Sequence, residues 1–345
     1  MKKISKNNLL LAWQKIDEKF NLFLPKSENG NVKFKNFQES GDVDLRTLKT
    51  SVPLKNFVFP QTETFLKFKT KDKKIKFDIT SVAEDEYVIF GSRPCDIKSL
   101  EILDNIFLRE PVDTYYKAHR DRAIIISLAC KNPESSCFCG AFEIEPTSVN
   151  KATDISLIEA GDFYYWNTIS EKGQKITELL KDVLEEVSSE DLVVLNIEKD
   201  RIKLEVEKLP LNSLDLEKID GDLQEIFDKE NMWKELSRRC LACGSCTYVC
   251  PTCHCYDVKD YAGNNAGERF RCWDSCMFSD FTLMAHGNPR TDQMQRVRQR
   301  FMHKLIYYPN NHEGTYSCVG CGRCIEKCPV HIDIVKVIKK LVVNK

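Results

Sequence analysis

The spacing of apolar residues near the start of the chain is that of a helix. Between residues 9 and 23 apolar side chains recur at steps of three and four positions. Because Pro25 follows, the pattern predicts an amphipathic helix that ends before this proline. The apolar positions are Leu9, Leu10, Trp13, Ile16, Phe20 and Phe23.

From residue 32 onward the apolar residues alternate with polar ones or form short runs, in which β-branched and aromatic types predominate. Glycine, proline, asparagine and aspartate separate these runs, which is typical of strands joined by turns. We therefore predict a mixed sheet in the first part of the chain. Its predicted strands are residues 32–37, 65–69, 75–79, 87–90, 124–128, 163–166 and 192–197.

The last part of the chain favours helices. Residues 291–308 combine apolar side chains at helical spacing with four cations, and a further apolar helix follows His331. A basic helix could bind an acidic partner, but a solvated face is the simpler interpretation, so we expect these cations to face solvent. They are Arg296, Arg298, Arg300 and Lys304.

The composition is that of an ordinary globular protein with a hydrophobic core. Of the 345 residues, 42% are hydrophobic and 30% are charged, and the net charge of −1 gives no sign of affinity for nucleic acid or membranes. No apolar run is long enough to span a membrane. The first residues lack the features of a signal peptide, so we expect a cytoplasmic protein. In that compartment the 16 cysteines are expected to bind metal rather than to form disulfides.

Eight of these cysteines form two copies of the motif C-x2-C-x2-C-x3-C-P. Bacterial-type ferredoxins use this run to hold [4Fe–4S] clusters, and in two-cluster ferredoxins the fourth cysteine ligates the other cluster. Two complete copies therefore predict two [4Fe–4S] clusters, with Cys250 serving the cluster of the second run and Cys328 that of the first. The motif cysteines are Cys240, Cys243, Cys246 and Cys250, followed by Cys318, Cys321, Cys324 and Cys328.

Four more cysteines lie in the first part of the chain, at the ends of predicted buried strands or in the loop that follows. In α/β sheets this edge usually carries the binding site. We therefore predict a third [4Fe–4S] cluster in the N-terminal domain. A zinc site is the main alternative, because four thiolates also suit zinc, and buried structural thiols are another. The four residues are Cys95, Cys130, Cys137 and Cys139.

The remaining four cysteines have no spacing that we can assign to a cluster. We interpret Cys253, Cys255, Cys272 and Cys276 as thiols packed beside the clusters, or as ligands in an altered arrangement of the first cluster. The long segment between the two runs favours an α-helical two-cluster domain over a compact ferredoxin. The predicted fold class is thus α+β. A mixed α/β domain spans residues 1–228, and an α-helical ferredoxin-like two-cluster domain spans residues 229–345.

Several short motifs occur together with the two runs, and their combination resembles one family of electron-transfer subunits. The family comprises the iron–sulfur electron-transfer subunit of anaerobic sulfite reductase and the β subunit of sulfhydrogenase, which is a cytoplasmic [NiFe] hydrogenase. The resemblance covers most of the chain, and Cys272 departs from the family pattern. The motifs are Phe90-Gly-Ser-Arg-Pro-Cys95-Asp-Ile97, Cys137-Phe-Cys139, Cys250-Pro-Thr-Cys253-His-Cys255-Tyr256 and Trp273-Asp-Ser-Cys276.

The resemblance implies an electron-transfer subunit that is not catalytic alone. Family members pair with a flavin-containing subunit that takes electrons from NAD(P)H, and with a catalytic subunit that carries siroheme or nickel–iron. The alternative is a stand-alone iron–sulfur reductase with a substrate site beside a cluster, formed by thiols such as Cys253 and Cys255. A zinc-stabilised interaction protein is disfavoured, because zinc modules typically use paired C-x-x-C motifs rather than four-cysteine runs that end in proline.

Overall fold

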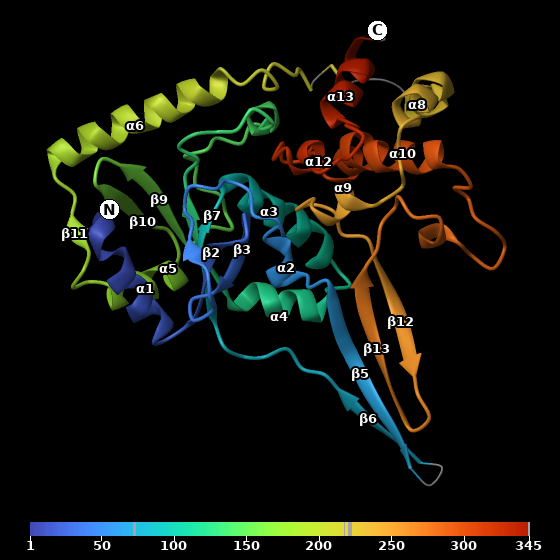
Figure 1. Cartoon of the computed structure of the whole chain (residues 1–345), viewed down its shortest axis with the longest axis horizontal. Helices are drawn as coiled ribbons and strands as arrows, with labels where there is room; N and C mark the ends of the chain where they lie inside the picture. The colour runs from blue at the N-terminus through green and yellow to red at the C-terminus, as the bar shows by residue number, and fades with distance from the viewer. Residues whose placement is uncertain (72–73, 217, 220–222, 344–345) are drawn as a thin grey trace.

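Parallel strands form the middle of a large sheet in the first part of the chain (Figure 1). The computed structural model describes residues 1–71, 74–216, 218–219 and 223–343. Strands β2, β7, β8 and β9 run parallel, and antiparallel strands continue the sheet on both sides. Over the described residues the order is β11-β1-β10-β9-β8-β7-β2-β3, with β4 paired to β2. The strands are β1 (Lys2–Ser5), β2 (Asn21–Glu28), β3 (Asn31–Asn36), β4 (Asp42–Val43), β7 (Tyr87–Ser92), β8 (Ala123–Leu128), β9 (Ile155–Ala160), β10 (Phe163–Thr168) and β11 (Glu185–Glu186).

Helices cover both faces of this sheet because its central strands are apolar on both sides. On β7, Val88 and Phe90 lie in a core shared with α1 and α5, whereas Tyr87 and Ile89 lie in a core shared with α3 and α4. The buried strands predicted at 87–90 and 124–128 are thus confirmed as the centre of the sheet. The helices are α1 (Leu9–Asp17), α2 (Lys55–Val58), α3 (Pro94–Phe107), α4 (Thr114–Arg122) and α5 (Glu171–Leu179).

Two of the predicted elements are wrong. The first helix ends at Asp17, and the next apolar residues belong to β2, where Leu22 and Leu24 are buried in the sheet core. Residues 192–197 lie within helix α6 (Ser189–Glu207) rather than in a strand. A capping box formed by Ser188 and Asp191 satisfies free backbone N–H groups at the start of this helix and thereby favours it.

A second sheet joins segments that lie far apart in the sequence. Strands β5 (Thr62–Lys71) and β6 (Lys74–Ile79) come from the first part of the chain, whereas β12 (Tyr256–Ala262) and β13 (Ala266–Trp273) lie between the two cysteine runs. In the order β12-β13-β5-β6 they project from the body of the molecule as an arm (Figure 1). The prediction of an α-helical two-cluster domain is therefore confirmed only in part, because a β-hairpin from this part of the chain pairs with β5.

Short helices around the cysteine runs share one hydrophobic core. Trp233, Phe301 and Ile338, from α8, α10 and α13, are fully buried in it, and Phe138 from the first part of the chain lies in the same core. The two parts of the chain are thus packed together at the cysteines. The elements are α7 (Leu223–Asp228), α8 (Glu230–Ser237), α9 (Ser245–Tyr248), α10 (Gln293–Met302), a π-helical turn (His303–Tyr307), α11 (Tyr308–Asn311), α12 (Arg323–Glu326) and α13 (Ile334–Val343).

Candidate metal centres

The first cysteine run surrounds a cavity that we call cavity A. Cys240, Cys243 and Cys246 line it, and Gly244, with a φ of 72°, turns the chain into α9 between the second and third of these cysteines. Cys328, the last cysteine of the second run, completes the lining. Four thiols thus surround one space, although one of them lies far from the others in the sequence.

The second run surrounds a neighbouring cavity, cavity B. Cys318, Cys321 and Cys324 line it, and its fourth cysteine is Cys250 from the end of the first run. The two runs therefore exchange their last cysteines. This is the placement expected where the fourth cysteine of each ferredoxin-type run serves the other cluster.

Cavity C lies at the edge of the large sheet. Because β7 and β8 are parallel neighbours, the segments that leave their C-terminal ends meet there. Cys95 lies in the first turn of α3, Cys130 follows β8, and the next loop supplies Cys137 and Cys139. All four line the cavity, and Cys321 of the second run also lies on its wall. The structure therefore brings together the four N-terminal cysteines that the sequence places at one site.

The three cavities form a row with cavity B in the middle. Arg300 lines both A and B, and Cys321 lines both B and C. At the far end of cavity A, Cys243 is exposed to solvent. The row thus runs from the surface of the cysteine-rich part to the edge of the large sheet.

The loop that borders cavity C packs against the backbone of the second run. Phe138 donates its N–H to the carbonyl of Gly320 over 2.8 Å. Gly320 and Gly322 have φ angles of 59° and 75°, and a Cβ on either would lie 2.4 Å from the carbonyl oxygen of Phe138 or 2.3 Å from that of Ser136. Only glycine permits this approach, so a direct backbone contact joins cavities B and C.

Buried cations face the cysteines of cavities A and B, and within the described part of the chain they have no carboxylate partner. Arg300 and Lys304 are only 4% and 3% exposed, so the prediction that they face solvent is wrong. Lys304 Nζ lies 3.3 Å from Cys250 Sγ, and Arg300 Nε has no hydrogen-bond partner. An iron–sulfur cluster held by four thiolates is anionic, so these cations and the unpaired donor fit such a group.

Burial and the neighbouring cysteines act in opposite directions on the pKa values of the buried cations. Burial disfavours the charged form of Lys304, yet the thiolate of Cys250 raises the pKa of Lys304 above the ordinary value. For Lys55 burial prevails and lowers the pKa to about 8. Its Nζ donates to the carbonyl of Cys253 over 2.7 Å and lies 3.9 Å from the ring centroid of Trp273. The site is thus built to receive negative charge.

A hydrogen bond with Cys253 lowers the pKa of Cys250, but burial raises the pKa of the other thiols of cavities B and C. It raises the pKa of Cys130 to about 11 and those of Cys139, Cys318 and Cys321 to about 12. The exposed Cys243 differs, because a hydrogen bond with Ser245 lowers its pKa. A cysteine must lose its proton to ligate iron, so loading of the buried cavities releases protons.

None of the four remaining cysteines lines cavity A, B or C. Cys253 lies against Cys250, and Cys255 lies against Cys276, each pair in side-chain hydrogen-bond contact. Cys272 lies apart from them on β13. This placement fits the interpretation of Cys253, Cys255 and Cys276 as thiols packed beside the cavities, whereas Cys272 does not fit it.

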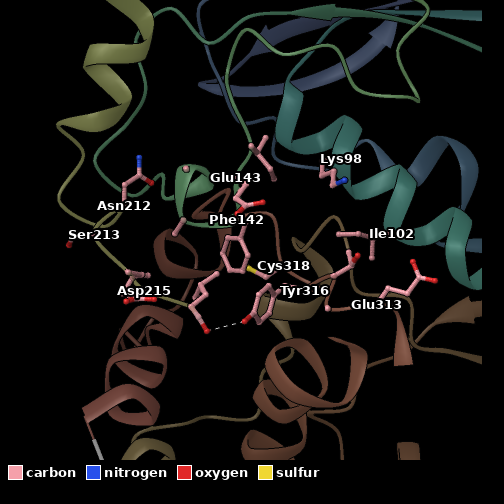
Figure 2. Close-up of a pocket in the computed structure, with 17 residues that line it drawn as sticks. Lys98, Ile102, Phe142, Glu143, Asn212, Ser213, Asp215, Glu313, Tyr316 and Cys318 are labelled. Carbon is pink, nitrogen blue, oxygen red and sulfur yellow. Dashed lines mark hydrogen bonds between the residues drawn. The ribbon is translucent and has the colours of Figure 1, made fainter. Parts of the chain in front are cut away.

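A surface cavity of about 780 Å³ opens next to cavity B (Figure 2). Its wall includes Cys318, and the rings of Phe142 and Tyr316 meet there edge to face with centroids 5.6 Å apart. Tyr316 Oη donates to the carbonyl of Leu216 over 3.0 Å, which closes one side of the cavity. One cysteine of cavity B therefore lies on the wall of a space large enough for a small molecule.

The described residues contain neither a ready-made site for a single metal ion nor a membrane-spanning helix. No three histidine, cysteine, aspartate or glutamate side chains among them meet as the ligands of a single metal ion would. A tetrahedral zinc site needs such a convergence, whereas the four ligands of a cubane bind different irons and lie further apart.

None of the described helices is long and apolar enough to cross a membrane.

The exchanged ferredoxin-type runs define the class of protein, an iron–sulfur protein, and residues 239–332 match the model of the 4Fe-4S dicluster domain. Over most of its length the chain is similar to sulfhydrogenase 2 subunit beta of Pyrococcus furiosus. The two are 31% identical over 332 residues, which cover 95% of this chain and 94% of that protein. The chain therefore belongs to the sulfhydrogenase β subunit family, and the resemblance found in its motifs is confirmed. No solved structure gave a significant match.

Proposed function

We propose that this chain is a cytoplasmic electron-transfer subunit of a sulfhydrogenase-type complex. It relays electrons between a flavin-containing, NAD(P)H-linked subunit and a catalytic subunit that carries nickel–iron, or siroheme in a sulfite reductase-type complex. The observation that carries this proposal is the row of three four-cysteine cavities, which leads from the exposed Cys243 to the edge of the large sheet.

In this proposal each cavity holds one [4Fe–4S] cluster through the four cysteines described above. Residues 229–345 act as the two-cluster unit, and residues 1–228 provide the third site. Cavity B receives a wall from each unit, since Phe138 lines it together with the second run. The order of the sites is then A, B, C, because A and C have no lining residue in common, whereas each shares one with B.

When bound, a [4Fe–4S] cluster supplies a one-electron carrier whose potential depends on net charge, hydrogen bonds to sulfur and exposure. The side chains of this protein set those three properties. Phe138 and Phe301 exclude water from the cavities, and Arg300 and Lys304 offset negative charge. Electron relay needs no general acid or base, and we assign none.

The proposal is tested by measuring iron, sulfide and zinc in anaerobically purified protein, together with EPR spectra after reduction with dithionite. We expect about twelve irons per chain, four for each cubane. Cys137→Ser should remove about four of them and leave the signals of the dicluster part. About eight irons in the wild-type protein would confine the clusters to cavities A and B, and zinc without sulfide would contradict the proposal.

A stand-alone reductase is the second candidate, and the surface cavity beside Cys318 is the observation that favours it. A substrate there would lie next to a cysteine of cavity B. Turnover of polysulfide or sulfite by the isolated, iron-loaded chain with a chemical electron donor would support this candidate. Cluster reduction without turnover would support the electron-transfer subunit.

A further inference from the structure

The outer half of the arm carries an uncovered apolar face. Residues directly opposite each other in antiparallel strands share a face, so the register places Ile75, Phe77 and Ile79 of β6 beside Leu66 and Phe68 of β5. The three β6 side chains are 58%, 60% and 76% exposed. Single exposed apolar residues are ordinary, but here three lie on one sheet face next to the half-buried Leu66 and Phe68. We call these five residues the arm patch.

The arm patch continues a face that is covered closer to the body. Arg269 of β13 pairs with Leu66, and Arg271, two residues further along the same face, is buried. Arg271 donates to Glu63 and Asp113 over 2.6 and 2.5 Å, which ties the base of the arm to the body. The same face is therefore packed at its base and exposed at Ile75, Phe77 and Ile79.

The opposite face of the arm is basic. Residues of the alternate register lie there, and the lysines among them outnumber the two carboxylates of the same face. The outer arm is therefore apolar on one face and positively charged on the other. The residues are Lys67, Lys69, Lys71, Lys74 and Lys76, with Asp78 and Glu268.

These lysines also argue against self-association. β6 and β12 are the edge strands of the arm sheet, and lysine side chains on an edge strand disfavour pairing with an identical strand. Two arms joined through their β6 edges would place Lys74 and Lys76 of both copies side by side, at a cost in Coulomb energy. A partner that presents an apolar wall to one face and carboxylates to the other meets no such repulsion.

We propose that the arm inserts into a cleft on another subunit of the complex, with the arm patch against an apolar wall and the basic face against aspartate and glutamate. This inference rests on the proposed function, because the partner is a subunit of that complex. The apolar side chains provide the buried area, and the lysines on the opposite face select an acidic partner and steer its approach.

The test uses the whole complex, purified through a tag on this chain, with the double substitution Phe77→Ser and Ile79→Ser. Quantitative mass spectrometry measures the amount of each co-purified subunit, and iron content and EPR report on the chain itself. We expect at least a tenfold loss of one subunit with unchanged iron content. Leu10→Ser on α1 is the matched control, because Leu10 is 56% exposed but lies outside the arm, and it should retain every subunit.

A second variant tests the charge and keeps the proposal testable if the first variant fails to fold. Lys69→Glu with Lys76→Glu changes only the basic face, and we expect it to release the same subunit. In the wild-type complex, retention of that subunit should fall as the salt concentration rises, because salt screens the attraction.

Full retention of all subunits by both arm variants would overturn the docking proposal and leave the proposed function intact. The docking proposal would also be overturned if the arm variants retained all subunits but no longer bound vesicles of anionic lipid, or no longer self-associated. If the wild-type chain itself brings down no other subunit, the role as a subunit fails, and the docking proposal fails with it.

Discussion

Arg323 forms a bidentate ion pair with Asp96 across the contact between the two parts of the chain. Its Nη1 and Nη2 atoms lie 2.6 and 2.7 Å from the carboxylate oxygens, and the two residues are 2% and 1% exposed. Arg323 lies in the second run between Cys321 and Cys324, and Asp96 directly follows Cys95. The pair therefore fixes the wall of cavity C to the wall of cavity B.

Replacing Asp96 with asparagine should destabilise the protein strongly, because Arg323 would keep its charge without a counter-charge in a place that water does not reach. Removal of one partner from a buried ion pair costs about 3–5 kcal/mol. We expect a lower midpoint of thermal unfolding for the anaerobic, iron-loaded protein. Iron content should also fall, since one of the contacts that hold cavities B and C together is lost.

Arg269 and Asp260 provide the matched control. They form the same bidentate geometry, with both contacts at 2.7 Å, but both side chains are 55% exposed. An exposed pair is solvated and screened, so Asp260→Asn should leave the unfolding midpoint nearly unchanged. Equal losses in the two variants would show that burial does not determine the effect.

Gly320→Ala should disturb cavities B and C together. The added methyl group would lie 2.4 Å from the carbonyl oxygen of Phe138, a backbone atom that can move only if the loop of cavity C moves. The φ of 59° adds backbone strain of about 1–2 kcal/mol for a residue other than glycine. We expect altered EPR signals from the cluster of cavity B and a loss of iron from cavity C.

Gly161→Ala separates strain from contact. Gly161 has a φ of 56°, and a Cβ there would meet nothing within 4 Å, so the substitution introduces the strain without the collision. Its EPR spectrum and iron content should match those of the wild-type protein. If Gly161→Ala changed the clusters as Gly320→Ala does, the contact between the two loops would have no special role.

Much of the sheet was predictable because its central strands are short apolar runs between turn residues. The same reasoning failed for residues 192–197, where an apolar run with two valines lies in a helix. A signal for that helix was present in the sequence, since Ser188 and Asp191 have the spacing of a capping box. The hairpin of β12 and β13 alternates like other strands, but its pairing with β5 joins residues too far apart to be read from one sequence.

The cysteines of the sites were predictable from their spacing, whereas the buried cations were not recognised. Arg300 and Lys304 are four residues apart and lie beside Val297 and Phe301 on the helix, so helical geometry places them at the margin of the apolar face. Cations are usually solvated, which favoured the wrong interpretation. Only the thiols that they meet in the fold explain why they are buried.

The exchange of the last cysteines can be tested in a protein that lacks the cluster of cavity B. Cys318→Ser with Cys324→Ser removes two of its cysteines and should leave the signals of cavities A and C. In that background, Cys328→Ser should alter or abolish the signal of cavity A, because Cys328 lines it. Cys250→Ser should have no further effect, since Cys250 lines cavity B. The opposite result would mean that each run ligates its own cluster with all four cysteines.

Lys304→Met should lower the reduction potential of the cluster in cavity B. Lys304 Nζ lies 3.3 Å from Cys250 Sγ, and its positive charge favours the more negative, reduced state of a cluster in that cavity. At about 5 Å and an effective dielectric constant of about 20 one charge contributes roughly 3 kcal/mol, which corresponds to a shift on the order of 100 mV. Redox titration followed by EPR measures this shift in reduction potential.

Lys327→Met is the control, because Lys327 is exposed and its charge is screened by water and salt. A similar shift in both variants would assign the effect to net charge, whereas a shift in Lys304→Met alone would assign it to the buried ammonium beside Cys250.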